Sequence, residues 1–379
     1  MKKCFSSLFG RGAIFSFIFL PLQGASAASP TVSPTQDVRC VGAVTCQSSM
    51  CHGGASPSRD QFTIWSREDF HSRAYATLVT ARSVRIAESL GLASATASNR
   101  CTTCHAPFAD LPASQLASTA TVTEGVSCET CHSGAADWLR GHTRPDWTYA
   151  DRVHAGLRDL RSAYVRANTC VACHQVIDSA LLKAGHPELI FELDGQDASE
   201  PRHWTEKEEW FGPKAWLVGQ AVALREMSRQ VAEQGSTDSD LVAQQNALAW
   251  LLQQVPGNGW AYEGQTGTGG FAPWSNQLAE TISGQDWNPT KSTAALATLA
   301  GTYSTFTDSS IPLAERELRA ERLVLGLDRL FKSLHKEPSA PGQAELSALF
   351  AAVQDRASFN PGNFASLLQK FAEVVTPKK

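Results

Sequence analysis

Three short segments of the chain repeat one pattern, in which two cysteines stand three positions apart and a histidine follows the second directly. The segments CTTCH, CETCH and CVACH comprise Cys101, Cys104 and His105; Cys128, Cys131 and His132; and Cys170, Cys173 and His174. On a short helical turn, thiols at this spacing reach the two vinyl groups of one porphyrin, and the next residue presents its imidazole to the iron. The pattern therefore predicts three sites of covalent haem c attachment.

A fourth segment, CQSSMCHGG, carries the same residue types with a longer gap. Four residues separate Cys46 from Cys51, and His52 follows the second thiol. The two additional residues can bulge outward without moving the sulfur atoms beyond reach of the vinyl groups. We therefore expect four covalently bound haems, with His52, His105, His132 and His174 as the proximal iron ligands.

Zinc binding and disulfide bonds are the alternative interpretations of these cysteines. Paired C-x-x-C units occur in zinc ribbons, and an exported protein can form disulfides. Neither alternative explains a histidine after every cysteine pair. Cys40 is the unpaired thiol of the mature chain, and we interpret it as a small buried hydrophobic residue rather than half of an intermolecular disulfide.

The second axial ligand decides whether a haem carries electrons or binds a substrate, because only five-coordinate iron has an open position. Beyond the first residue the chain has two methionines: Met50 inside an attachment loop and Met227 in the cysteine-free half. Histidine is therefore the available second ligand. The histidines outside the attachment motifs are His71, His142, His154, His186, His203 and His335.

The N-terminus has the pattern of an export signal. Lys2, Lys3 and Arg11 precede the apolar run AIFSFIFLPL and the small-residue stretch GASAASP, which together predict a signal peptide at residues 1–27. The apolar run is about half as long as a bilayer-spanning helix. We expect an exported, periplasmic protein whose signal peptide is cleaved after Ala27.

Cysteine usage also predicts the domain organisation. After the signal peptide, every cysteine lies between Cys40 and Cys173. We predict a tetrahaem cytochrome c domain at residues 28–204 and a C-terminal helical domain without haem at residues 205–379. The net charge of −4, without a long basic block, gives no indication of nucleic-acid binding.

The histidines outside the motifs fall on several expected elements. A single helix is predicted over WSREDFHSRAYATLVTARSVRIAESLGL, closed by Gly91, with His71 on its apolar face. His142 follows Trp138 by one helical turn, and His154 begins a helical segment over residues 154–168. His186 precedes a proline, which favours an extended backbone.

The C-terminal half has the periodicity of a helical bundle. Two apolar stripes are formed by Leu241, Leu248 and Leu252 after a cap at Asp238, and by Leu323, Leu327, Leu330, Phe331 and Leu334. Gln245 interrupts the first stripe. The glycine-rich stretch over residues 262–277 lacks the neighbours of a phosphate site and is interpreted as a connector.

From about Val41 to Trp204 the chain resembles the exported tetrahaem cytochromes related to the hydroxylamine-oxidoreductase electron acceptor of ammonia-oxidising bacteria. The stretches that carry the resemblance, in order, are CQSSMCHGG, WSREDFHSRAY, RIAESLGL, EGVSCETCHSGAADWLRGH, CVACH and AGHPELIFEL. The resemblance implies a mainly α domain with a haem-packed core in which porphyrins lie in close pairs. It also implies that the distal ligands are His71, His142, His154 and His186, with the pairing to each iron open.

Larger relatives carry a further attachment site in the C-terminal half, but the corresponding stretch LAWLLQQVPGNGW contains no cysteine. We therefore expect no fifth haem.

Two functions are compatible with this sequence. The first is an electron carrier whose mostly bis-histidine haems relay electrons between redox partner proteins in the periplasm or at the membrane. The second is an oxidoreductase of a small nitrogen or sulfur compound that binds at one five-coordinate haem. Equal numbers of haems and distal histidines favour the carrier, for which no catalytic residue is assigned. A homo-oligomer is a further expectation.

Overall fold

The computed structural model describes residues 38–174, 177–233, 239–256, 270–337 and 339–376. Over these ranges the chain forms 16 α-helices and nine 3-10 turns, without a strand beyond one isolated parallel bridge between Cys40 and Leu116. The mainly α fold class expected from the sequence is confirmed. Within the same ranges no helix is long and apolar enough to cross a membrane. The expected signal peptide lies outside the described residues.

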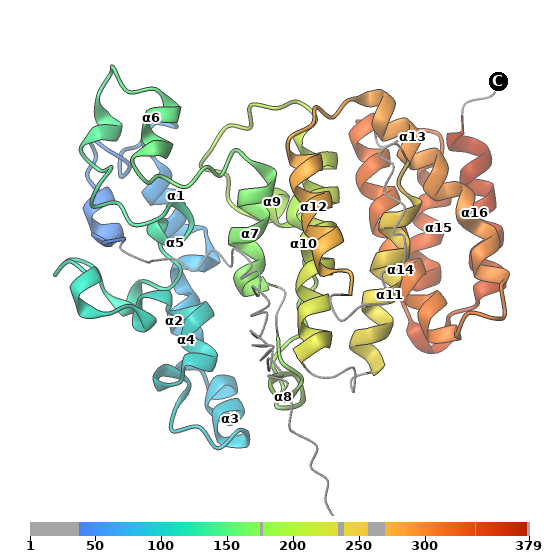
Figure 1. Cartoon of the computed structure of the whole chain (residues 1–379), viewed down its shortest axis with the longest axis horizontal. Helices are drawn as coiled ribbons and strands as arrows, with labels where there is room; N and C mark the ends of the chain where they lie inside the picture. The colour runs from blue at the N-terminus through green and yellow to red at the C-terminus, as the bar shows by residue number, and fades with distance from the viewer. Residues whose placement is uncertain (1–37, 175–176, 234–238, 257–269, 338, 377–379) are drawn as a thin grey trace, which may run out of the picture. The chain divides into compact units, whose positions relative to one another are not determined.

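Short helices joined by turns build the part of the chain that carries the attachment motifs (Figure 1). The α-helices of this part are α1 (Gln61–Arg67), α2 (Ala74–Thr77), α3 (Ala81–Ser89), α4 (Asn99–His105), α5 (Cys128–His132), α6 (Tyr149–His154), α7 (Ala163–His174), α8 (Ser179–Lys183) and α9 (Leu193–Ser199). The 3-10 turns are η1 (Ala43–Cys46), η2 (Phe70–Arg73), η3 (Ala95–Ala97), η4 (Pro107–Asp110), η5 (Ala113–Gln115), η6 (Val122–Glu124) and η7 (Gly141–Thr143). The three C-x-x-C-H motifs form the ends of α4, α5 and α7, so each motif histidine is the last residue of its helix.

The single helix expected around His71 is wrong, because two polar side chains interrupt it. The carboxylate of Asp69 accepts the backbone N–H of His71 and begins η2, and the hydroxyl of Thr80 accepts the N–H of Ser83 and begins α3. Such side-chain caps compete with the hydrogen bonds of a continuous helix. The expected end is correct, since Gly91 follows α3 with a φ of 66°. His71 therefore lies on a tight turn rather than on a helical face.

The helix expected over residues 154–168 is also interrupted. His154 is the last residue of α6, and α7 begins only at Ala163. Gly156 has a φ of 113°, a backbone conformation that ends helical geometry and favours glycine.

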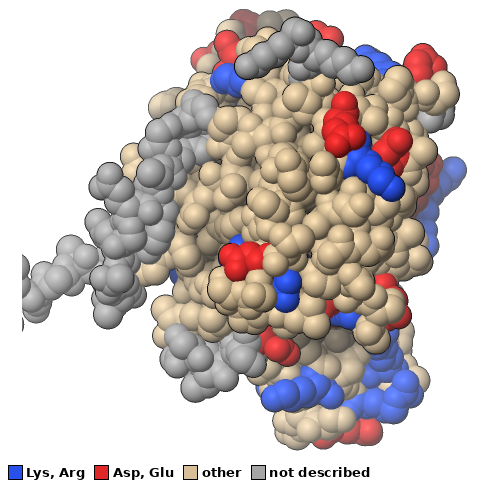
Figure 2. Space-filling model, turned by 90° about the vertical axis from the view of Figure 1, so that its right-hand side faces the viewer, with Lys and Arg blue, Asp and Glu red and all other residues tan. Residues whose placement is uncertain are grey.

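The C-terminal half forms the expected helical bundle (Figure 1). Its elements are α10 (Phe211–Glu233), α11 (Ser239–Gln254), α12 (Ala272–Ser283), α13 (Pro289–Ala300), η8 (Gly301–Thr307), α14 (Leu313–Leu334), α15 (Gln343–Val353), η9 (Arg356–Ser358) and α16 (Pro361–Val375). Helix α10 packs against α11, α12 and α14. On the face shown in Figure 2, charged side chains are sparse over the middle of the surface, and Lys and Arg gather in the lower part of the view.

The apolar stripe expected on α14 is confirmed: four of its five members are buried, and Leu334 is half-buried. Gln245, which interrupts the stripe of α11, is buried and donates to the hydroxyl of Ser228 at 2.9 Å. The expected cap Asp238 lies outside the described residues. The connector expected over residues 262–277 is wrong from Ala272 onward, where α12 begins with a proline in its first turn; residues 257–269 lie outside the described ranges.

The large apolar core draws residues from both sides of the domain boundary expected after residue 204. Ala167 and Val171 of α7 and Leu193 of α9 belong to the same buried cluster as the helices of the bundle. By contrast, residues 38–204, which carry the attachment motifs and are called the attachment segment below, have a small separate cluster. It is made of Leu78, Ala87, Ala95 and Ala106. The boundary itself stays a prediction. The core of the bundle consists of apolar side chains, whereas the attachment segment buries few apolar side chains of its own.

Candidate functional site

Each motif histidine faces the ring of one histidine from outside the motifs. The pairs and their ring-centre separations are His52 with His142 at 6.2 Å, His174 with His71 at 6.0 Å, His105 with His186 at 6.4 Å, and His132 with His203 at 6.5 Å. Two imidazoles on opposite sides of one metal ion, each with a metal–nitrogen bond of about 2 Å, hold their ring centres about 6 Å apart. The separations therefore fit an iron between each pair, and two thiols precede each motif histidine for porphyrin attachment.

Hydrogen bonds at Nδ1 determine which ring nitrogen is available to a metal. Backbone carbonyl oxygens lie within hydrogen-bond distance of Nδ1 in His105 (Ala74), His142 (Leu139), His186 (Pro187) and His203 (Pro201). A carbonyl oxygen can only accept, so Nδ1 carries the proton in these four rings. The lone pair then resides on Nε2, the nitrogen that binds iron when Nδ1 is protonated.

Burial favours the neutral form that ligation requires in four of these rings. Burial, with the neighbouring His203 and Arg158, lowers the pKa of His132 to about 4. Burial likewise lowers the pKa of His105, His142 and His174. Neutral imidazole is the metal-binding form, so the environment of these rings suits ligation at physiological pH.

The attachment motifs approach one another in two couples. The thiol of Cys46 lies beside that of Cys128, and the thiol of Cys104 lies beside that of Cys173. This contact and burial raise the pKa of Cys128 and of Cys173. The first motif therefore contacts the third, and the second contacts the fourth.

A buried carboxylate holds the first motif against the third. Glu129, inside the CETCH motif, accepts the backbone N–H groups of Val41 at 2.9 Å, Gly42 at 2.7 Å and Ala135 at 2.6 Å. Gly42 has a φ of 79°, and a Cβ there would lie 2.5 Å from the carbonyl oxygen of Thr119. Because Val41 and Gly42 immediately precede η1, these contacts fix the approach of Cys46.

Two arginines attach the His186 loop to the segment that carries the second motif. Arg100 of α4 forms an ion pair with Asp178 at 2.7 Å, and Asp178 caps α8 by accepting the N–H of Leu181. Arg82 donates to the carbonyl oxygen of Gly185 at 2.6 Å. His186 lies outside any helix, as expected from the following proline, and these contacts hold it opposite His105.

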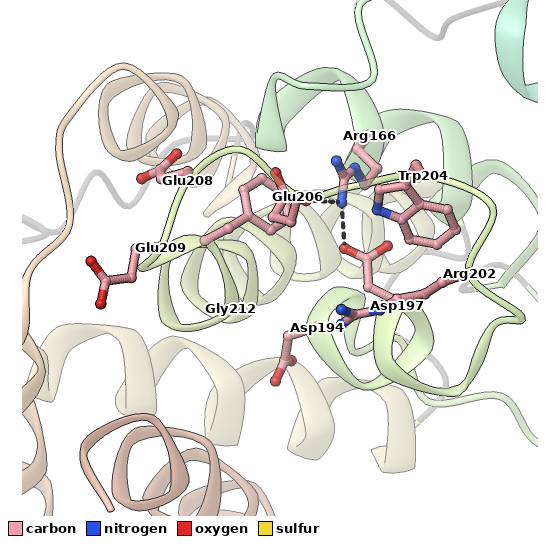
Figure 3. A pocket seen from close by; sticks show the side chains of 10 residues that line it. Arg166, Asp194, Asp197, Arg202, Trp204, Glu206, Glu208, Glu209 and Gly212 are labelled. Atoms are coloured by element: carbon pink, nitrogen blue, oxygen red, sulfur yellow. Dashed lines mark hydrogen bonds and ion pairs between the residues drawn. The ribbon is translucent and has the colours of Figure 1, made fainter. Parts of the chain in front are cut away.

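A cavity of about 310 Å³ lies beside the segment that carries His203 (Figure 3). On its wall, the guanidinium of Arg166 pairs with Asp197 at 2.8 Å and Glu206 at 3.1 Å. The same guanidinium lies 5.8 Å from the ring of Trp204, which contacts His203. Arg166 therefore joins Asp197, which precedes His203 in the chain, to Glu206, which follows it, and these contacts fix the backbone on both sides of His203.

The remaining residues singled out by the sequence lie away from these pairs. His154 is exposed at the end of α6 and makes no ring contact with another histidine in the described part of the chain, so its expected role as a distal ligand stays a prediction. The ring of His203, which was not among the expected distal ligands, lies opposite His132. His335 packs against Phe331 with ring centres 4.6 Å apart. Cys40 is buried with a free thiol, as expected, and burial raises its pKa to about 12.

Sequence reasoning missed Asp69. Its carboxylate oxygen lies 3.0 Å from Nδ1 of His71, and its side chain is 5% exposed. Burial raises the pKa of Asp69, but its hydrogen bonds with His71 outweigh this and lower the pKa overall; the same contact raises the pKa of His71. The available signal was an aspartate two positions before a candidate ligand, the usual spacing of a side chain that caps a turn.

Comparison with known proteins supports this chemistry. Residues 45–133 match the family model of cytochrome c554 and c-prime. Comparison with curated proteins and with solved structures gave no significant match. The matched segment contains the first three attachment motifs, and it supports a cytochrome c with covalently bound haem c and a role in electron transfer.

Proposed function

We propose that the protein is an exported tetrahaem cytochrome c that relays electrons through four bis-histidine haems between redox proteins of the periplasm or the membrane. The observation that carries the proposal is the set of four histidine pairs with ring centres 6.0 to 6.5 Å apart. Bound haem would supply a reversible one-electron couple at each iron.

The residues of the chain would bind and position the four groups. Each pair of motif thiols would form thioether bonds by addition to the two vinyl groups, and each histidine pair would supply both axial ligands. In this assignment His203 takes the place of His154 in the set of distal ligands and is the partner of His132. The contact of Cys46 with Cys128, and of Cys104 with Cys173, supports haems that lie in two close couples. Haems in such close couples would favour electron transfer over substrate binding.

An open iron would favour the alternative, an oxidoreductase of a small nitrogen or sulfur compound. Such a site requires a motif histidine without a second axial ligand. Each of the four motif histidines has an opposing ring in the described residues, which supports the carrier instead. The identity of the redox partners and the formation of a homo-oligomer stay predictions.

Mass and spin state test the proposal together. The mature protein should carry four covalent haems by mass spectrometry, show only low-spin ferric signals, and not bind carbon monoxide when reduced. One high-spin haem that binds carbon monoxide in the parent protein would indicate the oxidoreductase. Three haems would remove the CQSSMCH segment from the attachment sites.

Two matched variants test the ligand assignment. We expect His203→Ala to convert one haem from low spin to high spin and open it to carbon monoxide, because His203 faces His132. His154→Ala should leave the spectrum unchanged, because His154 is exposed. The opposite result for the two variants would return His154 to the ligand set.

A further inference from the structure

We infer that Asp69 is a positioning residue that lowers the reduction potential of the haem ligated by His71 and His174, by accepting a hydrogen bond from Nδ1 of His71. The inference rests on the proposed ligation of iron by His71. It deepens that function by naming the haem that retains electrons least readily.

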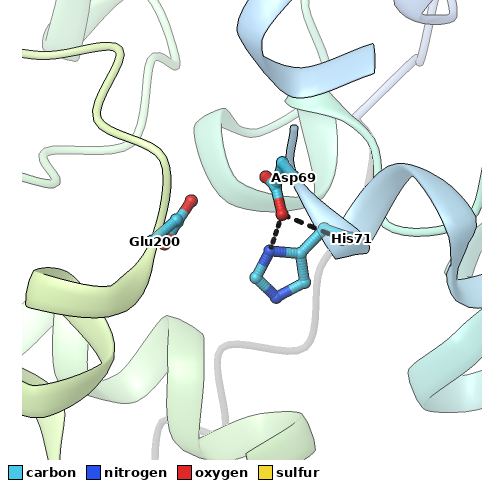
Figure 4. Close-up of side chains that lie close together, drawn as sticks. All are labelled: Asp69, His71 and Glu200. Atoms are coloured by element: carbon cyan, nitrogen blue, oxygen red, sulfur yellow. Dashed lines mark hydrogen bonds and ion pairs between the residues drawn. The ribbon is translucent and has the colours of Figure 1, made fainter. Parts of the chain in front are cut away.

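The acceptor at His71 differs in charge from the acceptors at the other distal rings. Nδ1 of His142, His186 and His203 faces a neutral backbone carbonyl. At His71 the acceptor is a carboxylate oxygen at 3.0 Å (Figure 4). Of the histidines in the described residues, His71 is therefore the one whose ring nitrogen forms an ion pair.

The structure holds this carboxylate in a fixed position and out of water. Asp69 is 4% exposed, and the same oxygen accepts the backbone N–H of His71 at 2.9 Å. The carbonyl oxygen of His71 in turn accepts the N–H of Val126 at 3.0 Å, just before the CETCH motif. The ring, its backbone and the carboxylate therefore form one rigid turn.

A second carboxylate approaches the same ring from another segment. Glu200, which follows α9, places an oxygen within 4.8 Å of a ring nitrogen of His71 and of an oxygen of Asp69 (Figure 4). No hydrogen bond joins Glu200 to His71 in the described structure. The hydrogen-bonded group and the merely neighbouring charge can therefore be separated by mutation.

The direction of the effect follows from electrostatics. A carboxylate that accepts the Nδ1 proton transfers electron density to the imidazole and strengthens Nε2 as a donor. A more anionic ligand stabilises ferric iron, which carries one more positive charge than ferrous iron. Reduction of this haem then becomes less favourable than reduction of the haems whose distal ligands donate to carbonyl groups.

The test removes the charge of residue 69 and keeps the shape of its side chain. In Asp69→Asn, the amide oxygen can still accept the backbone N–H of His71 and cap η2. We expect a redox titration of the haem-loaded protein to show one step with its equilibrium constant for reduction raised roughly tenfold, a shift of about 59 mV to higher potential. Haem content and low-spin signals should be unchanged.

A reciprocal variant is available at the first haem. The amide oxygen of Gln61 lies 2.9 Å from Nδ1 of His52, so Gln61→Glu introduces a carboxylate at an equivalent position. One step should then move to lower potential by a similar amount. Opposite shifts of two different haems are not expected from a loss of folding stability.

The outcomes separate the inference from the proposed function. If Asp69→Asn leaves all potentials unchanged while His71→Ala produces one high-spin haem, His71 is a ligand and the tuning role of Asp69 is wrong. If His71→Ala stays fully low-spin with four haems, the ligation itself is wrong. A larger shift for Glu200→Gln than for Asp69→Asn would also overturn the inference, because nearby charge rather than the hydrogen bond would then set the potential.

Discussion

Buried carboxylates recur in this protein, and the balance between burial and their polar contacts determines the direction in which each pKa shifts. Asp69 has a lowered pKa because of its hydrogen bonds with His71. Glu129 accepts three backbone N–H groups, yet burial outweighs them and raises its pKa. Asp194, in the first turn of α9, lies 2.8 Å from Nε of Arg329, but burial raises its pKa to about 7. Residues of one type therefore respond to pH in opposite directions.

Replacing Asp194 with Asn should change how stability depends on pH. The native pKa of about 7 lies above the ordinary value of 3.8, so between these values the native state binds the extra proton. The free energy of unfolding of the parent then falls as pH rises, by up to about 1.4 kcal/mol per pH unit from this group. We expect Asp194→Asn to gain stability relative to the parent from pH 5 to pH 7, measured by urea unfolding followed by circular dichroism.

A surface aspartate provides the control for that experiment. Hydrogen bonds with Ser310 lower the pKa of Asp308 below 3.8, so Asp308→Asn should show no relative slope between pH 5 and pH 7. Parallel stability curves for Asp194→Asn and the parent would contradict the expected ionisation.

Short elements tied by long-range contacts position the attachment motifs. The turns η1 and η2 have four residues each, and the helix α5 has five. Elements of this length are too short to be stable alone. Side-chain acceptors join them instead: Glu129 binds the backbone before η1, and Asp69 begins η2. The geometry of the motifs therefore depends on buried polar contacts more than on helix propensity.

The hydrogen bonds that the Glu129 carboxylate accepts from the backbone should be sensitive to an isosteric change of this side chain. In Glu129→Gln the amide N–H₂ replaces either the oxygen that accepts from Ala135 or the oxygen that accepts from Gly42, which leaves a buried backbone N–H without an acceptor at a cost of roughly 1–3 kcal/mol. We expect a lower melting temperature and faster hydrogen exchange at Gly42 or Ala135. Glu124→Gln is the matched control, since Glu124 is half-buried and binds the neighbouring Ala43. Equal losses of stability in the two variants would show that the burial of Glu129 is unimportant for its contribution.

Across the whole molecule, apolar side chains are distributed unevenly between the two parts. The bundle core contains large buried side chains such as Trp216, Phe331 and Phe371. The attachment segment has a cluster of four buried residues, of which three are alanines. Four porphyrins would supply the missing apolar volume there, so haem binding would contribute directly to folding.

Loss of one haem should therefore destabilise the attachment segment selectively. In the double variant Cys128→Ser and Cys131→Ser, we expect residues 38–160 to become sensitive to protease while α10 to α16 stay protected. Limited proteolysis with mass spectrometry measures both regions in one sample. A variant that lacks one haem yet resists protease as well as the parent would contradict a haem-supported core.

The amino-acid sequence alone predicted the mainly α class, which the structure confirms, and covalently bound haem c, which the family match supports. Local rules explain this success: the spacing of Cys128, Cys131 and His132 is satisfied within one helical turn, and the apolar period of α14 appears in consecutive residues. The position of His186 outside any helix also followed from a local rule, the effect of the next proline. Each of these features depends on residues within a few positions of one another.

Which ring lies opposite each motif histidine depended on the tertiary structure. His154 and His203 are both histidines in the C-terminal part of the attachment segment, and nothing local distinguishes a ring exposed at a helix end from one opposite His132. The burial of the Asp69 carboxylate likewise depended on the packing around His71. Contacts between residues tens of positions apart are set by how the chain folds back on itself, because the free energy of burial and of ion pairing depends on all the groups that surround a side chain.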